Sequence, residues 1–140
     1  VVTGDIVYDE VYPWTAETTP EQRKAWAVTL DKLSALKPER VVPGHQKSER
    51  TLDASSIQFT KDYLAAYDEA LAGSKNAKQL EATMKTKYPN AALPVIVKIG
   101  AEAAFKSGGK SMTTDGTRPT DGSQPKTRTQ PGSNTQRQSP

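Results

Sequence analysis

The sequence lacks cysteine and has a single histidine among its 140 residues. Without cysteine, the chain can form neither disulfide bonds nor thiolate metal sites. The lone His45 is too little for a self-contained zinc site, which normally uses three or four protein ligands. No apolar run approaches the roughly 20 residues of a membrane-spanning helix, so we expect no membrane partner. No signal peptide is visible either, and the sequence leaves the compartment open.

Large apolar side chains are almost absent from residues 107–140, which are rich in Ser, Thr, Pro, Gly and Gln. Such a composition buries too little apolar surface to offset chain entropy, and it predicts a disordered tail. The tail has five basic and two acidic residues, a net charge of +3 that equals the charge of the whole chain. Residues 1–106 are therefore electrically balanced, and we expect them to form one folded region. The tail has sparse charge and no aromatic residue, which argues against specific nucleic-acid binding. Weak binding of polyanions by the tail is the least favoured of three functional interpretations of the chain; the other two are given below.

The N-terminal part of the chain predicts short extended segments joined by turns. The β-branched run at residues 1–3 is typical of a strand, and Gly4 with Asp5 should end that strand in a turn. A second short extended segment is expected at residues 6–8. Pro13 argues against a further strand, so Trp14 is expected in a loop, at least half-buried.

A helix is predicted to follow this loop. Thr19, Pro20 and Gln22 have the pattern of a capping box with proline at the first helical position. Apolar residues at helical spacing continue the helix to Lys37, where the next residue, Pro38, ends it. The β-branched run after it predicts a buried strand that stops at Pro43–Gly44. Strand, loop, helix and strand in this order indicate a layered α/β structure.

Three more helices are expected beyond His45, at about residues 57–73, 80–88 and 91–105. The third could also be a strand around residues 95–97, but its continuation in alanine favours a helix. An aromatic stripe on the first of these helices is interpreted as core packing, with a substrate lid as the alternative; it consists of Phe59, Tyr63 and Tyr67. Glu49 and Arg50 are interpreted as a solvated turn.

Asp5 and His45 are the two candidates for chemistry. Each follows an expected strand and a glycine, so both side chains should project from strand ends into loops, where catalytic groups are usually placed. A carboxylate and an imidazole are a suitable ligand pair for zinc or iron. Gly-Asp is nevertheless a common turn pair, and a lone histidine is most often structural or exposed. Spacing alone therefore favours an ordinary structural role for both residues.

A resemblance changes that balance. The segment VVTGDIVYDEVYPW…TPEQRKAWAVTLDKLSALKPERVVPGHQ is similar to the second half of metallo-β-lactamase-fold hydrolases. In that family, a strand ending in Gly-Asp is followed by a helix and by a strand ending in Gly-His. The resemblance implies the C-terminal half of a four-layer αβ/βα sandwich, and residues 46–105 resemble the helical extension of some members. It also implies that Asp5 bridges two metal ions and that His45 binds the second ion.

The chain departs from the family in one important respect. The histidine-rich motif, His-x-His-x-Asp-His, and the next histidine ligand precede the aspartate in the family, and this sequence has neither. Because the chain opens with Val1 inside an expected strand, we expect the natural start to lie upstream, so that the N-terminal half of the same fold is the missing partner. The chain alone should then be inactive.

The resemblance implies that the parent protein is a metal-dependent hydrolase of a small-molecule substrate whose identity stays open. Two zinc ions are expected, although iron or manganese would also suit oxygen and nitrogen ligands. Asp5 would be the catalytic residue as well as a ligand, because it would orient the attacking water.

A non-catalytic interaction module that needs a partner chain to cover its sheet is the alternative. The aromatic residues Tyr8, Tyr12 and Trp14 also allow two interpretations. They could line a substrate pocket near the metals, but core packing is favoured.

Overall fold

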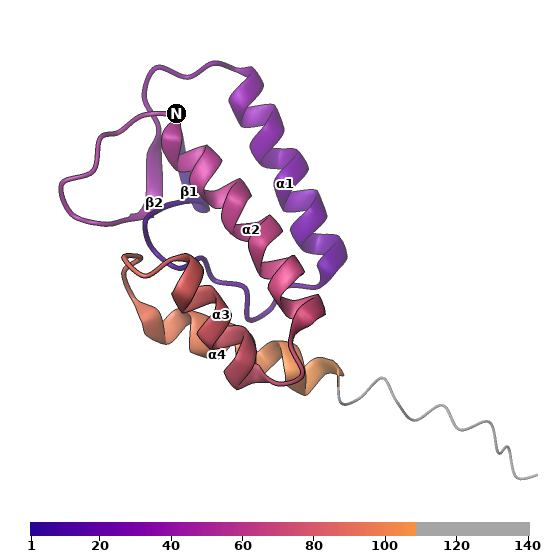
Figure 1. Cartoon of the computed structure of the whole chain (residues 1–140). Coiled ribbons are helices and arrows are strands. Elements are labelled where there is room, and N and C mark those ends of the chain that lie inside the picture. Colours follow the sequence, from indigo (N-terminus) through magenta and orange to yellow (C-terminus); the bar gives the residue numbers. More distant parts are fainter. Residues whose placement is uncertain (109–140) are drawn as a thin grey trace, which may run out of the picture.

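The computed structural model describes residues 1–108, which form a mixed α/β structure of four helices and a small parallel sheet (Figure 1). The elements in chain order are β1 (Val2–Asp9), α1 (Pro20–Ala35), β2 (Val42–Gln46), α2 (Ser55–Gly73), α3 (Ala77–Lys87) and α4 (Pro94–Gly108). The predicted α/β class is confirmed, as is the helical character of the last element, α4. None of the helices within these 108 residues is long and apolar enough to cross a membrane. Residues 109–140, which contain most of the predicted tail, lie outside the described residues.

The two strands pair in parallel, with Tyr8 opposite His45 and Gly4 opposite Pro43. The prediction that Gly4 and Asp5 end the first strand was wrong. Gly4 adopts the left-handed conformation, with φ of 53°, which glycine tolerates without steric cost. The irregularity in register on either side of Gly4 absorbs this kink, and the strand continues to Asp9. His45 likewise lies within β2 instead of after it.

Helix α1 begins as its local sequence predicts. The Thr19 side chain accepts a hydrogen bond from the Gln22 amide at 3.2 Å, and the Gln22 side chain accepts one from the Thr19 amide at 2.8 Å. The helix ends at Ala35, one turn before Pro38. The Trp26 indole N–H of this helix donates to the Ile6 carbonyl of β1 at 2.7 Å. The helix is therefore attached to the sheet by both packing and a hydrogen bond.

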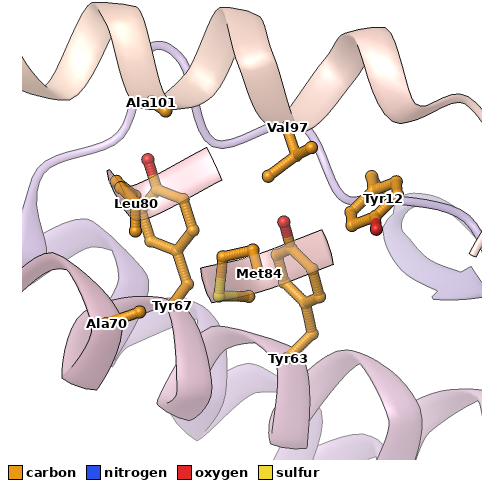
Figure 2. Packing of buried hydrophobic residues seen from close by; sticks show 8 residues of the cluster. All are labelled: Tyr12, Tyr63, Tyr67, Ala70, Leu80, Met84, Val97 and Ala101. Atoms are coloured by element: carbon orange, nitrogen blue, oxygen red, sulfur yellow. The ribbon is translucent and has the colours of Figure 1, made fainter. Parts of the chain in front are cut away.

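Helix α2 separates two apolar cores. One side faces the sheet and α1, where the buried cluster comprises Val7, Leu30, Val41, Ile57 and Leu64. The other side faces α3, α4 and the loop after β1, where the cluster comprises Tyr12, Tyr63, Tyr67, Ala70, Leu80, Met84, Val97 and Ala101. Figure 2 shows Tyr63, Tyr67 and Ala70 of α2 pointing together into this second core. The core-packing interpretation of Tyr63 and Tyr67 is therefore confirmed, because both side chains are fully buried.

Thr60 of α2 makes the most direct polar connection between the helices and the sheet. Its buried hydroxyl accepts a hydrogen bond from the Tyr8 amide at 2.9 Å. The same hydroxyl lies 2.9 Å from the Tyr8 carbonyl and 2.9 Å from the Ser56 carbonyl, and it can donate its single proton to either of these two oxygens. One side chain thus satisfies a backbone donor of β1 that would otherwise be buried without a partner.

We expect Thr60→Val to lower the free energy of unfolding by about 1–3 kcal/mol, because it leaves the Tyr8 amide unpaired at nearly constant volume. Thr86→Val is the matched control, since the exposed Thr86 makes only the local bond to the Ala82 carbonyl. The measurement is urea unfolding followed by circular dichroism. Equal effects of the two substitutions would contradict the role assigned to Thr60.

All five tyrosines of the chain have a raised pKa. Burial is the largest cause for each of them, and the effect is greatest at Tyr63. The Tyr63 hydroxyl is also buried without a hydrogen-bond partner among residues 1–108. Ionisation of these phenols therefore opposes folding, because the charged form is favoured in the unfolded chain.

The stabilising effect of neutral tyrosine is complete below the unfolded pKa of about 10 and is lost as the pH rises through the folded pKa values. We therefore expect phenolate absorbance near 295 nm to appear together with the loss of circular dichroism. Tyr63→Phe should keep neutral-pH stability and weaken the dependence on alkaline pH. Ionisation of several tyrosines near pH 10 with an intact dichroism spectrum would contradict this expectation.

Candidate functional site

The parallel pairing of β1 and β2 brings Asp5 and His45 together. The His45 Nε2 atom lies 3.1 Å from the Asp5 Oδ1 atom, and the two side chains are 48% and 81% exposed. Two ligands on one tetrahedral zinc ion, at bond lengths near 2.0 Å, lie about 3.3 Å apart. The two donor atoms are thus spaced like ligands of one ion, and they are also accessible to one. The donor chemistry fits zinc, iron or manganese.

The ring of His45 is held by an aromatic neighbour. It stacks on Tyr8 with the ring centroids 5.2 Å apart and an angle of 16° between the planes. Tyr8 in turn contacts Trp26 of α1 at 6.1 Å between centroids. Burial raises the pKa of Tyr8, a Trp14 backbone hydrogen bond opposes this, and the charge of Asp5 adds to the increase. Tyr8 therefore remains a neutral, fixed support for the imidazole.

A close backbone contact sets the separation of the two strands. A Cβ atom on Gly44 would lie 2.5 Å from both the carbonyl carbon and the carbonyl oxygen of Gly4, and 2.9 Å from the Asp5 amide nitrogen. Those distances are far below van der Waals contact, so only glycine fits at position 44. The backbones of Gly44 and Gly4 are thus in close contact. Because His45 follows Gly44 and Asp5 follows Gly4, this contact explains why the two side chains meet.

Asp5 and His45 are the only pair of potential metal ligands at this place among the described residues. No group of three or more His, Cys, Asp or Glu side chains within residues 1–108 could hold a metal ion. The next carboxylate along β1, Asp9, is buried and is engaged by the Arg50 guanidinium, with Nε 3.1 Å from Oδ2. Arg50 also lies 3.5 Å from Glu10. Asp5 and His45 therefore have no third potential ligand beside them among residues 1–108.

The prediction of a solvated turn is confirmed for Glu49, which is exposed in a turn, but it missed that the partly exposed Arg50 pairs with a buried carboxylate. Its guanidinium makes two hydrogen bonds to Asp9, and this bonding raises the pKa of Arg50. The pairing compensates the burial of the Asp9 carboxylate. No local sequence signal indicated this contact, because 41 residues separate the two partners.

A pocket of about 690 Å³ opens beside Asp5 and His45. Its lining comprises Asp5, Ile6, Tyr8, Val11, Tyr12, Trp14, Gln22, Ala25, Trp26, Thr29, His45, Leu93 and Ile96. We call this space the aromatic pocket. Tyr8, Tyr12 and Trp14 all line it, while Tyr8 and Tyr12 are also buried in the protein interior. The core-packing interpretation is therefore confirmed for Tyr8 and Tyr12, while a substrate role for the pocket stays a prediction.

Several pocket residues were not predicted from the sequence. Gln22, Ala25, Trp26 and Thr29 follow one another at helical spacing on one side of α1, so their periodicity could have indicated a shared surface. Leu93 and Ile96 come from the start of α4. Nothing local in the sequence places that segment near β1.

Comparisons with protein-family models, with curated proteins and with solved structures found no match to this chain. The side chains of the site and their geometry are therefore the basis for any assignment of function.

We expect Gly44→Ala to lower the free energy of unfolding by roughly 1–3 kcal/mol, because the added methyl group overpacks the contact with Gly4. The same change should increase the separation of Asp5 and His45. Urea unfolding measures the first effect, and chemical-shift changes at the His45 ring measure the second.

Gly73→Ala is the matched control for this substitution. Nothing lies within 4 Å of a Cβ atom at Gly73, so this change should be neutral or should stabilise the fold by about 0.4–1 kcal/mol. A Gly44→Ala variant as stable as the Gly73→Ala variant would refute the close contact of the strands.

Proposed function

We propose that the chain is the C-terminal half of a metallo-β-lactamase-type four-layer sandwich and that the complete protein is a metal-dependent hydrolase. Asp5 and His45 would be two ligands of a dinuclear centre, most simply of zinc. The convergence of these two side chains at 3.1 Å, from strands that lie side by side, is the observation that supports the proposal. Asp9 lies on the same strand with three residues between it and Asp5, but Asp9 is buried and only Asp5 is accessible to an ion.

The exposed surface of the sheet gives independent support. A two-stranded sheet is marginally stable by itself, and apolar residues on these strands remain exposed: Val1, Val2, Ile6 and Val42. Val2 is the extreme case at 81% exposed. Such residues are suited to further strands, which the proposal assigns to the missing N-terminal half of the same fold.

Each residue of the site has a defined role in the proposal. Metal ions bound here would lower the pKa of a coordinated water towards 7 and polarise the scissile bond of a small-molecule substrate. His45 would bind through its neutral Nε2 atom, with its ring orientation maintained by Tyr8. Asp5 would hold the metal pair and accept a hydrogen bond that orients the attacking water. With only two ligands, the chain alone would be inactive.

A non-catalytic interaction module is the second candidate function. It rests on the same exposed apolar residues of β1 and β2, which could bind a partner chain without any metal. In that case, the contact between Asp5 and His45 would be an ordinary surface ion pair. Metal content distinguishes the two candidates.

The test is elemental analysis of the full-length protein, including the residues that its gene encodes ahead of Val1. We expect about two zinc ions per chain in the purified protein, in line with the dinuclear sites of metallohydrolases. Asp5→Asn and His45→Ala should each lower metal affinity strongly, since each removes a direct ligand, and hydrolytic activity should fall with the metal content.

Asp31→Asn is the control, because Asp31 is an exposed carboxylate on α1 whose partner is Lys61. It should leave the metal content unchanged. A full-length protein without bound metal, or a gene that encodes no histidine cluster ahead of Val1, would overturn the hydrolase proposal. Stoichiometric binding of a partner chain by such a metal-free protein would support the interaction module.

A further inference from the structure

We infer that the aromatic pocket binds the apolar part of an uncharged substrate, such as the acyl or aryl group of a neutral ester, lactone or amide. Its role as a substrate site rests on the proposed hydrolase function. The pocket places apolar walls beside Asp5 and His45, so a ligand filling it would present its polar bond to those two side chains.

The side chains that line the pocket disfavour an anionic group inside it. None of the residues that line the pocket is lysine or arginine, and the only carboxylate is Asp5. Within the pocket itself, a phosphate or sulfate group would meet no lysine or arginine, so only the proposed metal ions at its edge could pair with an anion. The lining is instead dominated by aromatic and aliphatic side chains, which match an uncharged hydrocarbon group.

The size of the pocket suits a small molecule. Its volume of about 690 Å³ lies within the range of roughly 300–1,000 Å³ that is typical of small-molecule sites. The walls come from four separate parts of the chain: the region from β1 to Trp14, helix α1, His45 of β2, and the segment from Leu93 into the start of α4. Trp26 is fixed there by its hydrogen bond to the Ile6 carbonyl, so this wall is already formed without a ligand.

Leu93 provides a second observation that points to a ligand. It lines the pocket, is 51% exposed and has a left-handed backbone with φ of 59°. This conformation is unfavourable for a bulky residue, and such strain is concentrated at functional sites. The preceding residue, Ala92, is tied to the segment after β1: its amide donates to the Glu10 carbonyl at 2.8 Å, and its carbonyl accepts from the Tyr12 amide at 3.2 Å. The result is an apolar side chain kept at the edge of the pocket instead of in the core.

The chain provides its own reporter for a binding experiment. It has two tryptophans, Trp14 and Trp26, and both line the pocket. In the full-length protein, we expect methyl octanoate to change the fluorescence of these residues saturably. In the same protein after removal of metal with a chelator, octyl phosphate, which has the same alkyl chain and an anionic head group, should bind roughly tenfold more weakly than the ester or worse. Tryptophans ahead of Val1, where the gene encodes any, are replaced by phenylalanine.

Two substitutions test the pocket without disturbing the core. Ala25→Arg places a charge at an exposed position of α1 in the lining, and it should weaken ester binding by roughly tenfold or more. Ala35→Arg is the matched control, because Ala35 is exposed on the same helix and lies outside the lining. Leu93→Asn suits the left-handed backbone while removing the apolar side chain, so it should weaken ester binding without loss of thermal stability.

The outcomes separate this inference from the hydrolase proposal. Asp5→Asn should lose metal and still bind methyl octanoate. A full-length protein that holds its metal but shows no saturable response to the ester would overturn the inference alone, and would indicate that the missing half of the fold fills the pocket. Tighter binding of octyl phosphate after removal of metal, or equal effects of Ala25→Arg and Ala35→Arg, would also overturn it. Ester binding by a wild-type full-length protein that takes up no metal would support the pocket and overturn the hydrolase proposal.

Discussion

The contact between the backbones of Gly4 and Gly44 determines the geometry of everything around it. A side chain at position 44 would collide with the Gly4 carbonyl at 2.5 Å, so the two strands can approach this closely only because glycine is present. Each glycine is followed by a polar residue, Asp5 or His45. Parallel pairing at this contact therefore places a carboxylate and an imidazole next to each other, 40 residues apart in the chain. The left-handed backbone of Gly4 accommodates the irregular register without ending β1.

Two strands cannot maintain such a contact alone, since an isolated pair is only marginally stable. Helix α2 stabilises β1 through the Thr60 hydroxyl and through the apolar cluster around Val7. Helix α1 adds the indole bond from Trp26, and the segment after β2 returns Arg50 to Asp9. The packing of α3 and α4 on the far side of α2 then keeps that helix in place (Figure 1). The site depends on the whole helical scaffold even though its two polar residues belong to the strands.

Local sequence signals predicted local structure well. The capping pattern at Thr19 and Gln22 identified the start of α1, because both partners lie within one turn. The proximity of Asp5 and His45 was expected from the family resemblance, although both residues lie within their strands instead of at the strand ends. Gly4 was misinterpreted because a Gly-Asp pair is equally compatible with a turn and with a kinked strand. The Arg50–Asp9 pair and the position of Leu93 beside the pocket depend on tertiary contacts between distant segments, for which a single sequence carries no local signal.

The aromatic pocket and the pair of Asp5 and His45 differ in how much of each is formed by this chain alone. The aromatic pocket is complete within the described residues, because Trp26, Tyr8 and Leu93 are held by bonds within this chain. As a metal site, the polar pair would not be complete: Asp5 is 81% exposed, and two ligands in water would compete poorly with hydration of a cation. In the proposed arrangement, the layer that covers Val2 and Ile6 would also exclude water from Asp5 and add the remaining ligands. Metal binding would then be coupled to association of the two halves, while selection of the substrate would depend mainly on this half.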